Sequence, residues 1–352
     1  MKSRNFASDN NAGMSPEALR CLIEANAHHT PAYGDDTFTA DAKQSLMRWL
    51  ETDAEIHFVT GGTATNCLSI AGSIRNYQSV ICHEFSHIQN DECHAPGFFN
   101  SGIQLRPLPG PNAKLDPASF AAVFEASHGV HGTLPGLVSV TQCTEAGTCY
   151  TLEELQSIAS KTHELGIFLH MDGARFANAI AALDVSPAEM SWKAGIDILS
   201  LGGVKNGLAF GEALVVFNPR AVDRLDYRVK QSGQLSSKMR FLSAPWKGYL
   251  ESGEWLRNAK QSNAMAQLLA TSLPDIDGIA MPFPVETNAV FCSMPEIAYH
   301  SMLDRGWTFY PFPQMNAYRL MCSWDTQSED VEAFVSDLKA VLGEIPLQAK
   351  TL

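Results

Sequence analysis

The chain has 352 residues, enough for one large domain with a smaller one beside it. Hydrophobic residues make up 45% of the sequence and charged residues 18%, a balance typical of soluble globular proteins. The formal net charge of −13 argues against a surface for nucleic acids or anionic membranes, and no apolar run approaches the roughly 20 residues that a membrane span needs.

The cysteines and the first residues favour a cytoplasmic protein. The eight cysteines are scattered along the chain without a C-x-x-C pair, so we expect small buried residues with reduced thiols. Residues 1–6 show no apolar signal region.

From about residue 56 the chain alternates short apolar runs with helical patterns. The expected strands are residues 56–60, 79–82, 137–141, 167–171, 196–199 and 213–217. The expected helices between them are residues 64–74, 152–165 and 174–183, the second of which begins with a capping box at Thr151 and Glu154 and stops at Gly166. Strands separated by helices predict crossover connections and a mainly parallel sheet, with functional residues at the carboxyl ends of the strands.

The pattern changes after about residue 243, which predicts a smaller α/β unit with a boundary near residue 250. Residues 246–273 read as one long helical stretch. The remaining expected elements are strands within 285–294, 307–312 and 318–323 and helices near 296–305 and 329–342.

Two strand ends carry residues that together indicate a pyridoxal phosphate (PLP) site. Lys205 lies in a glycine-flanked turn after the 196–199 strand, and Asp172 ends the 167–171 strand. A PLP enzyme needs a lysine amine for the Schiff base and an aspartate for the pyridinium nitrogen. Taken singly, Lys205 would be a surface lysine and Asp172 a helix N-cap or the ion-pair partner of Arg175.

A glycine pair follows the first strand and opens a helix. Gly61, Gly62 and Thr63 would present backbone amides to an anion at the positive end of the helix dipole. The segment matches neither a Walker A loop nor a dinucleotide fingerprint. The alternative is a tight turn capped by Thr63.

The strongest competing signal is an H-E-x-x-H match from His83 to His87, the pattern of zinc proteases. That motif needs a helix so that both histidines share one face, whereas here it follows directly on a strand. In a PLP site one of the imidazoles would instead stack as a flat ring over the cofactor.

Two further polar residues lie in unusual surroundings. His131 sits in a glycine-rich loop before a strand, where a surface loop is the alternative. Arg319 sits inside an apolar strand and needs a partner anion, either an internal carboxylate or a substrate carboxylate gripped by both arms of the guanidinium.

Together these segments resemble the threonine aldolase family of PLP fold type I, and most closely the bacterial low-specificity L-threonine and phenylserine aldolases. The matching segments, in family order, are FASDN (6–10), YGDD (33–36), GTATN (62–66), HMDGARF (170–176), GVKNG (203–207) and KMR (238–240). The resemblance implies an N-terminal arm (1–38) that contributes to the active site, a large PLP-binding domain (39–250) and a small C-terminal domain (251–352).

The resemblance also implies roles by position. Lys205 would carry the Schiff base, Asp172 would pair with the pyridine nitrogen, Gly62 and Thr63 would bind the phosphate, and His87 would stack on the ring. Ser8, Arg175 and Arg319 would hold the substrate carboxylate, and His131 would lie near the substrate hydroxyl. Arg240, with Arg228 as a second candidate, would reach a phosphate in a neighbouring subunit.

The expected activity is cleavage of β-hydroxy-α-amino acids to glycine and an aldehyde. His87, His131 or a water is the candidate base, and no metal is expected. The segment 228–240 is basic in an acidic chain, and the resemblance implies that it lines the phosphate site of a neighbouring subunit, so we expect a homo-oligomer, a tetramer rather than a dimer. The alternatives are another fold type I reaction such as β-elimination or aminotransfer, a zinc hydrolase using His83 and His87, and a PLP-binding protein without turnover.

Overall fold

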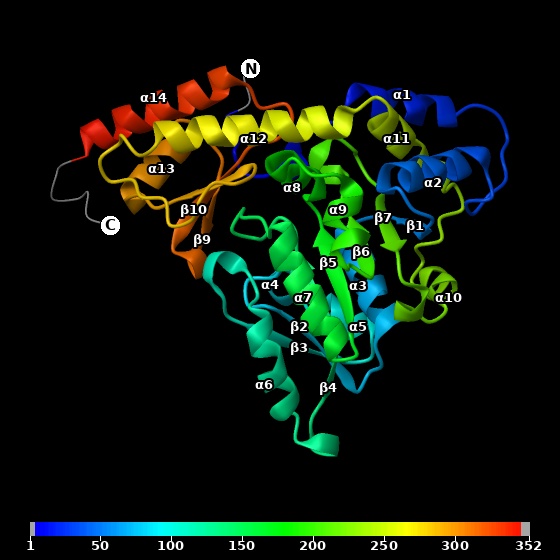
Figure 1. Ribbon diagram of the computed structural model, residues 1–352. Coiled ribbons are helices and arrows are strands. Elements are labelled where there is room, and N and C mark those ends of the chain that lie inside the picture. The colour runs from blue at the N-terminus through cyan, green and yellow to red at the C-terminus, as the bar shows by residue number, and fades with distance from the viewer. Residues whose placement is uncertain (1–3, 346–352) are drawn as a thin grey trace.

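Two sheets with helices packed around them form the molecule, as Figure 1 shows in the computed structural model, which describes residues 4–345. The larger sheet has seven strands in the order β1-β7-β6-β5-β4-β2-β3, and the smaller has three in the order β8-β10-β9. No helix among the described residues is long and apolar enough to cross a membrane.

The larger sheet is mainly parallel, as the sequence predicted. Its strands are β1 Glu55–Val59, β2 Gln78–His83, β3 Gln104–Leu108, β4 Leu134–Thr141, β5 Phe168–Gly173, β6 Ile198–Leu201 and β7 Glu212–Val216. Only β7 runs against its neighbours, so β1 points the same way as the other five. The carboxyl ends of β4, β5 and β6 are in register, because Thr141 pairs with Asp172 and Asp172 pairs with Ser200.

Side-chain alternation along β5 separates an apolar face from a polar one. Leu169 and Met171 are fully buried in the core that includes α7. His170 and Asp172 point to the opposite face, where Asp172 meets Asn66 of helix α3. Asp172 therefore faces α3 across the sheet.

The helices of the large-sheet region are mostly short. They are α1 Pro16–Ala25, α2 Thr37–Leu50, α3 Gly62–Ser73, α4 His87–Asn90, α5 Ala95–Phe99, α6 Phe120–Glu125, α7 Leu152–Glu164, α8 Phe176–Leu183, α9 Pro187–Met190, α10 Leu225–Gln231 and α11 Arg240–Glu251. The predicted capping box at α7 is present, since Thr151 and Glu154 each accept a hydrogen bond from the other's backbone amide.

The smaller sheet is antiparallel and has its own apolar core. Its elements are α12 Glu254–Ser272, β8 Ala289–Cys292, α13 Glu296–Asp304, β9 Tyr310–Phe312, β10 Ala317–Met321 and α14 Ser328–Glu344. Figure 1 shows α12 running along the top of both sheets, which links the two regions.

The N-terminal segment is anchored in this smaller core. Phe6 is 1% exposed and stacks on Trp307, with ring centroids 5.8 Å apart. Its backbone amide donates to the Thr308 carbonyl and its carbonyl accepts from Met321. This anchoring fixes the residues that follow Phe6 at the junction between the two sheets.

Several predicted elements differ from the structure. The single helical stretch over 246–273 is wrong: α11 and α12 are separate helices, because the chain turns at Gly253 with φ of +74°. The helix expected from residue 174 begins at Phe176, and the strand expected over 285–294 is confined to Ala289–Cys292. Strand β3 and the helices α1 and α2 were not predicted.

Candidate active site

Two joined cavities of about 250 and 300 Å³ open at the carboxyl ends of the parallel strands. The residues that line both cavities are Asn10, His87, Asp172, Ala174 and Lys205. The first cavity extends toward the smaller sheet, and the second toward the start of α3. The predicted lysine and aspartate therefore lie where the two cavities meet.

The second cavity ends at the amino terminus of α3. Gly61 is the N-cap residue and forms no side-chain cap, so the first amides of this 12-residue helix are left for another acceptor. A Cβ atom at Gly61 or Gly62 would have no neighbour within 4 Å, which shows open space beside the backbone. Thr63 is exposed and does not cap the helix. This end of the cavity has the donor set that a phosphate group requires.

Asp172 is 4% exposed and its carboxylate is held from two sides. Oδ1 accepts from the Ala174 amide at 3.0 Å, and Oδ2 accepts from Asn66 Nδ2 at 2.8 Å. The N-cap of α8 is Arg175 rather than Asp172, so the aspartate does not act as the helix cap. Each of its two oxygens has a further lone pair that can accept a hydrogen bond from a donor in the cavity.

Lys205 lies in a 3-10 turn, Val204–Asn206, between β6 and β7. Gly207 has φ of +120°, and a Cβ at Gly202 would lie 2.6 Å from the Ala174 carbonyl oxygen, so both flanking positions require glycine. Burial, followed by the charge of Arg175, lowers the pKa of Lys205. Within residues 4–345 no group forms a hydrogen bond or ion pair with its amine. The amine is therefore free to react as a nucleophile.

The histidines of the H-E-x-x-H match lie on different elements. His83 ends strand β2, with Nε2 3.1 Å from the Gly110 carbonyl and Nδ1 accepting from the Phe85 amide. His87 begins α4 and lines both cavities. The zinc-hydrolase interpretation is wrong, because the motif is not helical and the imidazole of His83 is occupied by backbone groups.

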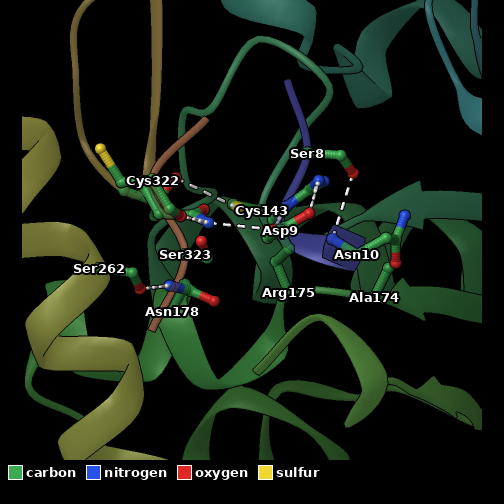
Figure 2. Close-up of polar contacts among 12 residues, drawn as sticks. Ser8, Asp9, Asn10, Cys143, Ala174, Arg175, Asn178, Ser262, Cys322 and Ser323 are labelled. Carbon is green, nitrogen blue, oxygen red and sulfur yellow. Dashed lines mark hydrogen bonds and ion pairs between the residues drawn. The ribbon is translucent and has the colours of Figure 1, made fainter. Parts of the chain in front are cut away.

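The N-terminal arm supplies a carboxylate for one of the predicted arginines. Asp9 accepts from Arg175 Nε at 2.7 Å and from Nη2 at 2.9 Å, as Figure 2 shows beside Ser8 and Asn10. Burial alone would raise the pKa of Asp9, but the charge and hydrogen bonds of Arg175 hold it below its usual value. Arg175 lines the first cavity, and with Nε and Nη2 bonded to Asp9 only its Nη1 is left for a ligand there.

Ser8 and Arg319 line the same cavity as Arg175. The Arg319 guanidinium lies 4.5 Å from the Phe312 ring centroid and donates from Nη2 to the Ala7 carbonyl at 3.1 Å. Its Nε is buried without a hydrogen-bond partner among the described residues. Burial, and then the charge of Arg175, lowers the pKa of Arg319 to about 10. Two cations facing one cavity favour an anionic ligand between them.

The structure of one chain does not bring His131, Arg228 or Arg240 to these cavities. His131 is exposed in the connection between α6 and β4. Arg240 donates to the Ala25 carbonyl and to Thr30 Oγ1. The roles expected for these residues stay predictions that require a second subunit.

Three buried or partly buried carboxyl groups around the site were not singled out from the sequence. Glu92 accepts from Asn66 Nδ2 at 3.0 Å, Glu212 accepts from the Gly203 amide at 2.6 Å, and Glu145 lines the first cavity. Burial raises the pKa of each of them to about 7. Glu212 is the first residue of an otherwise apolar strand, and a charged residue there is a signal that the sequence does show. Glu92 and Glu145 lie in irregular segments, where no helix or strand periodicity marks them.

Comparison with known proteins gives a consistent result. A family model described as beta-eliminating lyase matches residues 5–296. Low-specificity L-threonine aldolases of a Pseudomonas strain and of Pseudomonas aeruginosa are each 47% identical over 341 residues, covering 97% of this chain and 99% of theirs. A solved structure of Leishmania major threonine aldolase superimposes with a TM-score of 0.89 at 29% identity, covering 96% of this chain and 99% of that one.

Replacing Asp9 by Asn should destabilise the protein, because Arg175 would keep its charge in a buried position without a counter-charge. We expect a loss of about 3–5 kcal/mol in the free energy of unfolding, measured by urea denaturation. Asp41→Asn is the matched control, since Asp41 pairs with Lys247 at the surface, and it should cost at most about 1 kcal/mol.

The same variant should change the pH dependence of stability. The pKa of Asp9 is lowered on folding, so its stabilisation is present above the unfolded-state pKa of about 4 and is lost as the pH falls through the lower folded value. Wild type should lose this component between about pH 4 and the lower folded pKa, and Asp9→Asn should not. Equal acid sensitivity of the two proteins would contradict the assignment.

Proposed function

The chain belongs to the beta-eliminating lyase family and, within it, to the L-threonine aldolases, and on that premise we propose that it cleaves β-hydroxy-α-amino acids to glycine and an aldehyde with PLP as cofactor. As a member of that family it is a carbon–carbon lyase with fold type I architecture. The observation that carries the proposal is the meeting of Lys205, Asp172 and the open amino terminus of α3 around two joined cavities.

The residues present fit PLP. The first amides of α3 and the Thr63 hydroxyl would hold the phosphate, and Asp172 would pair with the pyridine nitrogen. His87 would cover one face of the ring, and the amine of Lys205 would attach the cofactor covalently. When bound, PLP supplies the electron sink that accepts the electron pair of the Cα–Cβ bond.

The chain's own residues then orient the substrate. Ser8, Arg319 and the Nη1 edge of Arg175 would hold its carboxylate, which fixes the rotation about the bond from nitrogen to Cα. Such orientation can contribute roughly 7–11 kcal/mol to lowering the barrier. Phe85, Phe312 and Met315 also line this cavity, so the β-substituent meets aromatic and apolar side chains.

We also propose a homo-oligomer, a tetramer rather than a dimer, in the cytoplasm. The support is indirect: Arg240 and His131 match family positions but lie outside the cavities of their own chain. In an oligomer, Arg240 or Arg228 would reach the phosphate of a neighbouring subunit, and His131 a neighbouring substrate hydroxyl. The free thiols scattered along the chain support the cytoplasm, because a reducing compartment keeps cysteines unpaired.

The first test of the function is Lys205→Ala. Without the amine the cofactor cannot be held covalently, so release of acetaldehyde from L-threonine should fall to background and the absorbance of the lysine-bound cofactor should disappear. Lys193→Ala, which removes a surface lysine paired with Glu51, should behave as wild type. Near-normal activity of Lys205→Ala would show that the lysine is wrongly assigned. Formation of a 2-oxo acid and ammonia by wild type would favour β-elimination instead.

Asp172→Asn tests the pairing with the pyridine nitrogen. An amide cannot hold a proton on that nitrogen by charge, so we expect the barrier to rise by about 3 kcal/mol, or roughly two powers of ten in kcat. The cofactor should remain bound, as judged by absorbance after gel filtration. An unchanged kcat would reject the pairing.

Mixing inactive subunits tests the assembly. Lys205→Ala and Arg240→Ala proteins, unfolded together and refolded, should regain part of the wild-type activity if the two residues reach one site from different chains. Each variant refolded alone is the control. A strictly monomeric, fully active wild type in sedimentation at assay concentration would contradict the oligomer.

A further inference from the structure

Glu145 is a cavity-lining carboxylate that the residue assignments above leave without a role. It lies in the loop after β4 and lines the same cavity as Lys205, Arg175 and Arg319. That cavity is where the carboxylate and hydroxyl of an amino-acid substrate would be held.

The carboxylate is held in place through one oxygen. Glu145 Oε1 accepts from the His87 backbone amide at 2.7 Å and from Thr141 Oγ1 at 2.9 Å. These are its two hydrogen bonds within the described part of the chain, so Oε2 is left for a group in the cavity. Thr141 is paired in the sheet with Asp172, so its hydroxyl ties Glu145 to the strand next to the one that carries Asp172.

The surroundings of Glu145 suit a group that exchanges a proton near neutral pH. Burial, opposed by the hydrogen bond from Thr141 and aided by the charge of Asp172, raises its pKa to about 7. The other charged or titratable side chains that line this cavity are His87 at the start of α4, Asp91 after α4, Cys143 from the loop after β4, Asp172 from β5, Arg175 before α8, Lys205 from the turn before β7 and Arg319 from β10.

The other candidate bases are less well placed in this chain. His131 lies outside both cavities of its own chain, and in the proposed oligomer it would reach a substrate hydroxyl only from a neighbouring subunit. Burial lowers the pKa of His87, and its Nδ1 is 3.5 Å from Asp91 Oδ2. The face of the His87 ring would be used in covering the cofactor.

We propose that Glu145 is the catalytic base that takes the proton of the substrate β-hydroxyl, an inference that rests on the proposed function. Oε2 accepts the proton as the O–H bond breaks, the oxygen forms the carbonyl of the aldehyde, and the Cα–Cβ bond breaks; bound PLP would supply the sink for its electron pair. After the aldehyde leaves, Cα takes up a proton to give glycine and Glu145 releases its own proton to solvent.

The test compares Glu145→Gln with Glu145→Ala. Glutamine keeps an oxygen that accepts from the His87 amide and Thr141 but cannot take a proton, whereas alanine removes both properties. We expect Glu145→Gln to lower kcat/KM for L-threonine cleavage by roughly 10²–10⁴-fold. Glu84→Gln, at an exposed glutamate two residues before Ser86, is the matched control and should leave cleavage unchanged.

Exchange of the glycine α-hydrogen in deuterated water, followed by NMR, provides the second readout. Glycine has no hydroxyl, so its exchange needs the cofactor and Lys205 but not the proposed base. Glu145→Gln should keep this exchange within about threefold of wild type and keep the cofactor absorbance. Loss of cleavage and exchange to the same extent would overturn the proposal, because it would show that Glu145 only positions His87.

The pH profile supplies the third readout. A base must be deprotonated, so wild-type kcat/KM should fall as the pH drops below an apparent pKa near 7, and Glu145→Gln should lack this limb. Cleavage by Glu145→Gln at the wild-type rate would overturn the assignment of Glu145 as the base but leave the proposed function standing. Failure of wild type to release aldehyde from any β-hydroxy-α-amino acid would overturn the proposed function and the inference with it.

Discussion

The buried ion pair between Asp9 and Arg175 joins the three parts of the chain that make the site. Asp9 comes from the arm that Phe6 anchors in the smaller core, and Arg175 follows the central strand β5. Asn288, from the edge of the smaller sheet, donates to Asp9 at 3.0 Å and to the Cys322 carbonyl at 2.8 Å. Because a buried charge without its partner is costly, this contact fixes the position of Arg175 more than it adds to net stability. The orientation of the substrate carboxylate depends on that position.

The distribution of charge in the site follows from what must enter it. A chain of net charge −13 has to receive a phosphate and a carboxylate. Arg175, Arg319 and the helix α3 terminus face the cavities, while burial raises the pKa of Glu92 and Glu212 to about 7, which reduces their negative charge near neutral pH. Neutral carboxyl groups do not repel the incoming anions, and Lys205, with its lowered pKa, is more readily present as the free amine.

Sequence patterns predicted the sheet and the residues at its strand ends, because both depend on local order. Asp172 lies near the end of β5 and Lys205 in the turn after the neighbouring parallel strand β6, so the alternation of strands and helices was enough to bring them together. Contacts between distant segments could not be predicted this way. The pairing of Asp9 with Arg175 spans 166 positions, and that of Glu145 with His87 spans 58. Strand β3, with Arg106 and Pro107 in an edge position, lacks the apolar run that identified the others.

The sheet register also separates two chemical tasks that one carboxylate could not perform together. Asp172 must stay ionised to hold a proton on the pyridine nitrogen, whereas a base must lose and regain a proton in each cycle. The structure provides Asp172 at the end of β5 and Glu145 in the loop after the adjacent β4, since Thr141, which orients Glu145, is the sheet partner of Asp172. The negative charge of Asp172 raises the pKa of Glu145, so the group that stabilises the cofactor also makes its neighbour a better proton acceptor.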